Sequence, residues 1–226
     1  MSKALIGIVG QSGTGKSSSL EGLPPEATII LDLERKGFPF KGINRFRVVP
    51  INNVADYYEQ AKKAIETPGV KYVVHESLTK FFELLLSSAR RTKKGYDIYS
   101  FFNESVRNFF DVTVKNEKAV NIFTAIDEIV KVSLPDGGEQ SLRRIKVAGK
   151  EHEGMIEKEL LMVLFTEVRK EKPGAPLSYC FQTNTDGITS AKTPRGMFSE
   201  QYISNDLASV IKKATEYYTG ESDSIS

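Results

Sequence analysis

A glycine-rich segment near the N-terminus has the residue types and spacing of a phosphate-binding loop. Residues 10–17 read GQSGTGKS and fit the pattern G-x-x-x-x-G-K-S. Glycines let the backbone curl so that successive N–H groups point inward at an anion. The lysine brings a positive charge to the outer phosphates, and the serine hydroxyl is a ligand for Mg²⁺. We therefore expect ATP with Mg²⁺ to be bound here. The expected nucleotide-binding residues are Gly10, Gln11, Ser12, Gly13, Thr14, Gly15, Lys16, Ser17 and Ser18.

Such a site also needs a carboxylate at the tip of a neighbouring strand. The apolar run at residues 71–74 predicts a buried strand, and Glu76 and Ser77 follow at its tip. A carboxylate there can hold Mg²⁺ through a bound water, although aspartate is the more usual residue. We expect Ser17 and Glu76 to form the metal site, and Lys16 and Glu76 to take part in catalysis. The alternative for Glu76 is an ordinary solvated glutamate in a loop.

Two further strand ends carry acidic side chains. The segment TIILDLERKG places Asp32 inside a predicted strand and Glu34 just beyond it. A carboxylate in this position can act as general base on the attacking water, so Glu34 is the third expected catalytic residue. Asp32 is the next candidate for that role. After the apolar run at residues 119–125, Asp127 is a candidate sensor of the γ-phosphate. An ordinary polar residue leaving a strand remains the alternative for each of these positions.

The elements that must position these residues alternate between strands and helices in the first half of the chain. Strands are predicted at residues 4–9, 28–33, 47–49, 71–74, 119–125, 160–168 and 177–183. Helices are predicted at residues 16–23, 53–66, 78–91, 98–114 and 204–218. Residues 129–134 and 142–147 flank the turn sequence PDGG and predict a hairpin. The pattern indicates an α/β fold with a mainly parallel central sheet flanked by helices, and an antiparallel hairpin extension in the C-terminal half.

Length, charge and cysteine content limit the class of protein. A chain of 226 residues favours a single domain, expected over residues 1–219 and followed by a disordered tail at 220–226. The formal net charge of +2 is nearly neutral, so any contact with nucleic acid must come from local clusters. The single cysteine, Cys180, excludes an intramolecular disulfide. There is no signal-peptide layout and no apolar run of membrane-spanning length, so we expect a cytoplasmic protein without a membrane partner.

The order of these motifs resembles the RecA-like ATPases, and within them the small phage-encoded ATP-binding proteins that act as recombinases or single-strand annealing partners. Besides the phosphate loop, IILDLERKG resembles the strand that carries the family's catalytic glutamate, which implies Glu34. VVHESLT resembles the aspartate-serine strand end, with Glu76 in place of aspartate. NIFTAIDE stands where the family has a glutamine or histidine sensor, and this chain has Asp127 or Glu128 nearby. The resemblance spans Ala4 to Tyr218.

The resemblance also implies assembly. SAKTPRGMF, residues 190–198, resembles the hairpin with which RecA-like subunits touch the nucleotide of the next subunit. It implies a homo-oligomer, either a ring or a filament, in which Lys192 and Arg195 act in trans. A phage-encoded member of this family would act in the cytoplasm of its host.

Two basic clusters are candidates for contact with single-stranded DNA. The first contains Arg90, Arg91, Lys93 and Lys94, and Tyr96 and Tyr99 follow as candidates for base stacking. The second contains Arg143, Arg144, Lys146 and Lys150. The alternative for both clusters is a simply solvated surface.

Three functions follow from these observations. The leading hypothesis is a RecA-like ATPase that acts on single-stranded DNA in recombination or annealing, with turnover that DNA stimulates. The second is a P-loop kinase of a small nucleotide-like substrate, for which Arg90 and Arg91 would belong to a lid. The third is a nucleotide-dependent interaction protein without significant turnover.

Overall fold

The central feature of the fold is an eight-stranded sheet. The computed structural model describes residues 4–114, 118–133, 135, 137–147, 155–170 and 172–220. Its sheet has the strand order β10-β9-β8-β1-β5-β4-β2-β3. The strands are β1 (Leu5–Val9), β2 (Thr28–Asp32), β3 (Arg47–Pro50), β4 (Tyr72–Glu76), β5 (Val120–Ala125), β8 (Met162–Arg169), β9 (Ser178–Gln182) and β10 (Tyr202–Ser204).

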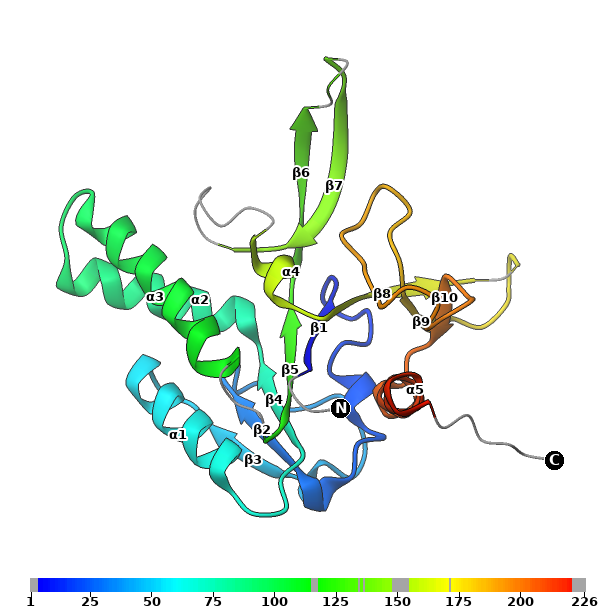
Figure 1. Ribbon diagram of the computed structural model, residues 1–226, viewed down its shortest axis with the longest axis horizontal. Coiled ribbons are helices and arrows are strands. Elements are labelled where there is room, and N and C mark those ends of the chain that lie inside the picture. Colours follow the sequence, from blue (N-terminus) through cyan, green and yellow to red (C-terminus); the bar gives the residue numbers. More distant parts are fainter. Residues whose placement is uncertain are drawn as a thin grey trace.

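The strands from β8 to β3 are parallel, whereas β9 and β10 are antiparallel additions at one edge. A separate two-stranded hairpin, β6 (Asp127–Ser133) and β7 (Glu139–Ile145), follows β5 and stands clear of the sheet in Figure 1. The predicted α/β fold, with a mainly parallel sheet and an antiparallel hairpin in the C-terminal half, is confirmed.

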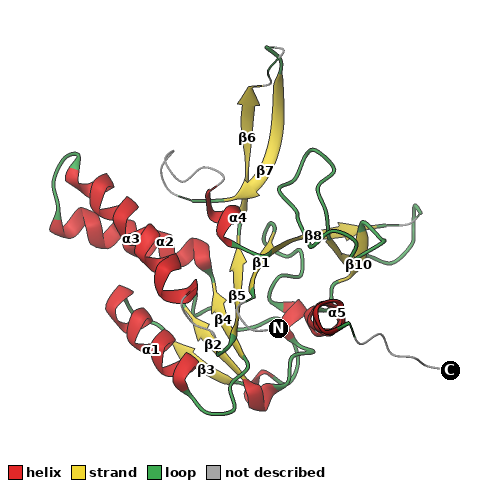
Figure 2. Ribbon diagram, in the orientation of Figure 1, coloured by secondary structure: helices red, strands yellow, loops and turns green. Residues whose placement is uncertain are grey.

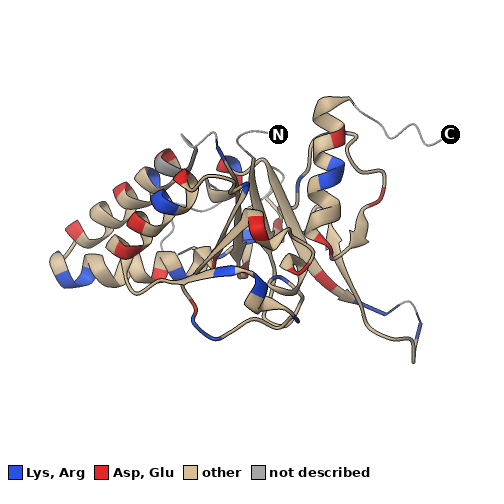
Figure 3. Cartoon of the chain, turned by 90° about the horizontal axis from the view of Figure 1, so that it is seen from below, with Lys and Arg blue, Asp and Glu red and all other residues tan. Residues whose placement is uncertain are grey.

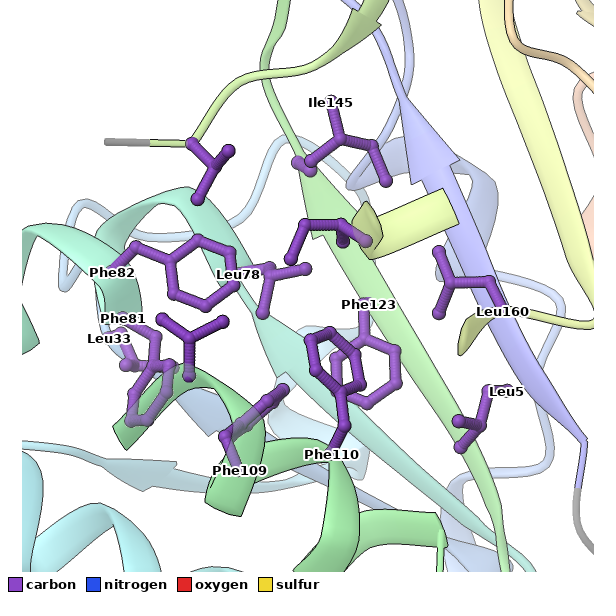
Figure 4. Packing of buried hydrophobic residues seen from close by; sticks show 14 of the residues in the cluster. Leu5, Leu33, Leu78, Phe81, Phe82, Phe109, Phe110, Phe123, Ile145 and Leu160 are labelled. Carbon is purple, nitrogen blue, oxygen red and sulfur yellow. The ribbon is translucent and has the colours of Figure 1, made fainter. Parts of the chain in front are cut away.

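Helices cover both faces of the sheet, as Figure 2 shows. The helices are α1 (Val54–Glu66), α2 (Leu78–Thr92), α3 (Asp97–Val114), α4 (Met155–Glu159) and α5 (Leu207–Thr219). On one face, α1, α2 and α3 bury an aromatic cluster against β1, β2, β4 and β5, part of which is shown in Figure 4. On the other face, α5 packs on side chains that alternate with the first set, such as Ile6, Ile8 and Ile30. Both faces of the central strands β1, β2, β4 and β5 are therefore buried, as a parallel sheet requires.

The segment after the phosphate loop differs from its prediction. A helix was expected at residues 16–23, but only a 3₁₀ turn, η1 (Ser18–Leu20), is present. Three consecutive serines and Gly22 have low helix propensity, and Pro24 closes the segment before a second turn can form. A single 3₁₀ turn has only a weak dipole. The backbone N–H groups of the loop itself must therefore provide most of the contact with an anion.

The remaining connections are short. Two further 3₁₀ turns are η2 (Pro25–Ala27) and η3 (Ile43–Arg45). Strand β10 was not predicted, because three residues are too few to show a periodic pattern. The expected tail falls almost wholly on residues 221–226, which lie outside the described part of the chain, as does Lys150 of the second basic cluster.

Candidate functional site

The phosphate-binding loop connects the end of β1 to η1. Gly13 and Gly15 adopt φ values of +80° and +100°, a region that side-chain-bearing residues avoid. Gly10 is needed for a different reason: a Cβ at this position would lie only 2.0 Å from Thr166 Oγ1 on β8. The loop therefore takes its shape from glycines that fold locally and from a close approach to a neighbouring strand.

Lys16 lies at the C-terminal end of the loop, with its ammonium folded back over the backbone. Its Nζ donates to the carbonyl oxygens of Gly10 and Gln11, each at 2.8 Å. Burial lowers the pKa of this ammonium. These carbonyls are weak partners that the phosphates of a nucleotide can replace, so the lysine is positioned for the role that the motif predicts.

Ser17 and Glu76 meet across the ends of β1 and β4. Ser17 Oγ donates to Glu76 Oε1 at 2.9 Å, and Glu76 Oε2 is buried without a hydrogen-bond partner among the described residues. Burial raises the pKa of Glu76, and the hydroxyls of Thr124 and Ser17 oppose that shift. A buried carboxylate beside the hydroxyls of Ser17 and Thr124 fits a hydrated Mg²⁺, which binds through one or two protein oxygens and the substrate phosphates.

Glu34 lies beside Ser77 because β2 and β4 are adjacent parallel strands. Asp32 pairs with Glu76 in the sheet, so the residues that follow each strand emerge side by side. Ser77 Oγ donates to Glu34 Oε1 at 2.7 Å, and Lys36 Nζ donates to Glu34 Oε2. Burial acts to raise the pKa of Glu34, but the bonds from Lys36 and Ser77 outweigh it and hold the pKa below its ordinary value.

One cavity brings these groups together. It has a volume of about 640 Å³ and lies at the carboxyl ends of β1, β2 and β4, where ligands of open parallel sheets bind. The lining residues are Ser12, Gly13, Gly15, Lys16, Ser17, Ser18, Glu34, Lys36, Gly37, Phe38, Pro39, Glu76, Ile126 and Tyr179. Part of the phosphate loop and both strand-tip glutamates therefore face the same space.

Comparison with known proteins assigns the family. The model of the family AAA_24, described as an AAA domain, matches residues 2–197.

The chain belongs to this AAA domain family.

It is accordingly a P-loop NTPase domain, a class that binds nucleotide and Mg²⁺. A search of curated protein sequences finds no match. Among solved structures, a KaiC-like protein from the hyperthermophilic archaeon Pyrococcus horikoshii OT3 is similar, with a TM-score of 0.46 and 13% identity over 85% of this chain and 83% of that one. In the described part of the AAA domain, no helix is long and apolar enough to cross a membrane.

Asp127 is the buried centre of a polar network in the AAA domain. Its Oδ1 accepts from Gln11 Nε2 at 2.7 Å, and its Oδ2 accepts from Arg143 Nε at 2.8 Å. Arg143 also donates to Glu167 on β8. The expectation placed Asp127 beyond a strand end, but it is the first residue of β6, since only Ile126 separates β5 from β6. Its carboxylate links the phosphate loop to the hairpin.

Other predicted residues lie away from the cavity. Asp32 is buried at the end of β2 and accepts the backbone N–H groups of Glu34 and Arg35 at 3.1 Å and 2.8 Å. Lys192 pairs through its backbone with Val163, and Arg195 is exposed in the turn that follows. Neither lines the cavity of its own chain.

The two basic clusters have different surroundings. Arg90, Arg91, Lys93 and Lys94 are exposed at the turn between α2 and α3, far along the helical hairpin from the sheet edge that holds the cavity (Figure 1). In the second cluster, Arg143 is partly buried on Asp127 and Arg144 is buried, with an ion pair to Glu128 at 3.3 Å.

Sequence reasoning missed three contributors to the site. Lys36 follows Glu34 by two residues, and a positive charge so close to the expected base could have indicated an ion pair at the site. Thr166, which restricts residue 10, and Tyr179, which lines the cavity, come from β8 and β9. No local pattern connects these two residues to a loop more than 140 positions earlier.

Proposed function

We propose that this AAA domain binds ATP and hydrolyses it to ADP and phosphate. The observation that carries the proposal is the convergence of Lys16, Ser17, Glu34 and Glu76 on one cavity. These four side chains come from three separate segments and supply a phosphate-binding cation, a metal-facing hydroxyl and two carboxylates. That combination suits attack of water on a terminal phosphate.

In the proposed reaction, the oxygen of a water molecule bonds to the γ-phosphorus while the bond from that phosphorus to the bridging oxygen of ADP breaks. Glu34 accepts the proton that the water loses, and Ser77 holds the carboxylate in place through its 2.7 Å hydrogen bond. Lys16 leaves the loop carbonyls and stabilises charge on the transferred group. Ser17 and Glu76 would hold Mg²⁺ at this site, and the ion would supply neutralising charge on the phosphates.

The finer proposal is a RecA-like ATPase that acts on single-stranded DNA. Its support is the basic turn between α2 and α3, where Arg90, Arg91, Lys93 and Lys94 cluster; Figure 3 shows Lys and Arg at the free end of this helical hairpin. Tyr96 and Tyr99 are 81% and 48% exposed beside them. Cations with exposed aromatic rings suit a single strand, because phosphates and bases are both contacted.

The proposed working form is a homo-oligomer. Lys192 and Arg195 lie outside the cavity of their own chain, and Arg195 is exposed in a turn where Gly196 has φ of +80°. A cation in that position can serve the nucleotide of a neighbouring copy.

Hydrolysis of ATP by the full chain, measured with and without single-stranded DNA, tests the proposal. We expect Mg²⁺-dependent release of phosphate that DNA accelerates, and an increase in molecular mass with nucleotide and DNA. Lys16→Ala should abolish turnover, since its charge is needed on the phosphates. Equal turnover of wild type and Lys16→Ala would contradict the proposal. Tight ATP binding without phosphate release would favour an interaction protein, and phosphate transfer to an added nucleoside would favour a kinase.

A further inference from the structure

The ammonium of Lys36 occupies a position that the proposed reaction does not yet use. It donates to Glu34 Oε2 and lines the same cavity as Lys16. The side chain of Lys36 is 62% exposed, while that of Glu34 is 19% exposed. The lysine is therefore held at one end by a partly buried carboxylate, and the rest of its side chain can reorient in the cavity.

The backbone around Lys36 forms a tight turn with a defined conformation. Arg35 has φ of +55° and is the one described residue other than glycine with positive φ; Gly37 follows with φ of +81°. The carboxylate of Asp32 holds the turn by accepting the N–H groups of Glu34 and Arg35. Such a conformation costs a side-chain-bearing residue free energy, and these costs are found most often at functional sites.

The turn directs the side chains of Arg35 and Lys36 to different places. Arg35 is directed away from the cavity, with its guanidinium donating to Asn52 Oδ1 at 2.8 Å. Lys36 is directed into the cavity. Of these two residues, only Lys36 lines the cavity in which a nucleotide would bind. Arg35 instead connects the turn to Asn52.

The Glu34–Lys36 contact has a chemical consequence for the reaction. An ammonium bonded to a carboxylate makes it a weaker proton acceptor. Meanwhile, negative charge on the γ-phosphate needs cations beyond the lysine of the loop. Moving one ammonium from the carboxylate to the phosphate satisfies both needs at once.

We propose that Lys36 is a further catalytic residue, which leaves Glu34 when ATP binds and contacts the γ-phosphate. The inference rests on the proposed ATPase function. ATP thereby draws the ammonium away from the base, and Glu34 is free to take the proton of the attacking water. ADP lacks the γ-phosphate, so it leaves the Glu34–Lys36 contact in place.

Binding measurements separate this role from a surface ion pair. The variant Lys36→Met keeps the aliphatic stem and removes the charge, and Lys36→Arg keeps the charge. Lys62→Met, at an exposed position of α1, is the matched control. We expect Lys36→Met to weaken binding of the β,γ-imido analogue of ATP by about tenfold or more, the loss that fits one charge-assisted hydrogen bond, and to leave ADP affinity unchanged. Lys36→Arg should retain most of the affinity, and Lys62→Met all of it.

A double-mutant cycle tests the exchange itself. Glu34→Gln weakens the hold on Lys36 before ATP arrives, so we expect this variant to bind the analogue about threefold more tightly than wild type. The gain should vanish in Glu34→Gln combined with Lys36→Met. In single-turnover experiments at saturating ATP, Lys36→Met should slow hydrolysis by about 100-fold.

Two results would overturn the inference. Unchanged affinity for the analogue in Lys36→Met would show that the ammonium never reaches the γ-phosphate. Faster hydrolysis in Lys36→Met would show that it only restrains Glu34. Wild-type protein that binds no ATP would instead contradict the proposed function, so the two failures are distinguishable.

Discussion

The side-chain amide of Gln11 donates to the carboxylate of Asp127 at 2.7 Å, so the phosphate-binding loop is joined directly to the first residue of the β6–β7 hairpin. The second oxygen of Asp127 is bonded to Arg143 on β7. The loop is therefore connected through Asp127 to both strands of the hairpin.

This link should contribute to stability. Removal of the buried carboxylate in Asp127→Ala leaves Gln11 and Arg143 without their shared partner, and we expect a loss of about 2 kcal/mol in the free energy of unfolding. Lys131→Ala, which removes an exposed ion pair from the same strand, should cost less than about 1 kcal/mol. Chemical denaturation of both variants is the measurement. Equal midpoints would mean that the Asp127 network adds nothing beyond a surface pair.

Substitutions of Glu34 and Glu76 should affect different steps, hydrolysis and Mg²⁺-dependent binding. Glu34→Gln should keep ATP bound and slow hydrolysis by about 100-fold or more, because the general base is lost. Glu76→Gln should instead weaken Mg²⁺-dependent binding, since Glu76 faces Ser17 and not the proposed water. Nucleotide affinity with and without Mg²⁺, measured beside single-turnover rates, distinguishes them. Normal hydrolysis by Glu34→Gln would contradict the role of Glu34 as general base.

Charge removal at the turn between α2 and α3 should affect DNA and not ATP. Changing Arg90, Arg91, Lys93 and Lys94 together to alanine should weaken binding of single-stranded DNA and flatten its dependence on salt, because fewer counterions are released. ATP hydrolysis without DNA should be unchanged, since the cluster lies far from the cavity. Fluorescence anisotropy over a range of salt concentrations tests this. An unaltered salt slope would identify the cluster as a solvated surface.

Mixed oligomers should reveal action in trans. Arg195→Ala and Lys192→Ala should bind ATP and lose turnover, and the specific activity of wild type should rise with protein concentration. A mixture of Glu34→Gln with Arg195→Ala should regain part of the activity, because one interface then combines an intact base with an intact cation. Absence of rescue, together with activity independent of concentration, would show that these residues form an ordinary basic turn.

A buried histidine beneath the site predicts a pH dependence of stability. His75 bonds to Tyr57 Oη at 2.6 Å and to Asn121 Oδ1 at 3.1 Å, and burial lowers its pKa to about 4. The bond to the Asn121 oxygen assigns the proton to Nε2, which leaves Nδ1 to accept from Tyr57. The ring is therefore neutral in the folded protein.

The sign follows from the lower pKa of the folded state. An unfolded histidine has a pKa near 6.5, so the contribution of neutral His75 is present above that value and is lost as pH falls toward 4. Between pH 7 and 4.5, wild type should lose about 2 kcal/mol more than His75→Gln, which does not titrate. Denaturation in the presence of EDTA at several pH values is the measurement. Parallel curves for the two proteins would contradict a neutral buried histidine.

Short-range patterns in the sequence were sufficient to predict the phosphate loop, the alternation of strands and helices and the two strand-tip glutamates. Each depends on neighbours within a few residues: the spacing of glycines, lysine and serine, or a buried run followed by a carboxylate. The carboxyl ends of parallel strands share one edge of a sheet, and therefore Glu34 and Glu76 could be expected near Ser17. The helix expected after the loop was wrong, because serine and glycine propensities and Pro24 outweighed the usual context of the motif.

Only the tertiary structure decided which side chains meet across strands. Thr166 restricts residue 10 to glycine, Asp127 joins the loop to the hairpin, and Lys36 rather than Arg35 faces the cavity. The first two contacts bring together residues more than 110 positions apart, and the third depends on a left-handed backbone conformation at Arg35. Local propensity carries no information on sheet order or on the direction in which a strained turn points its side chains, because both are set by packing of the whole domain.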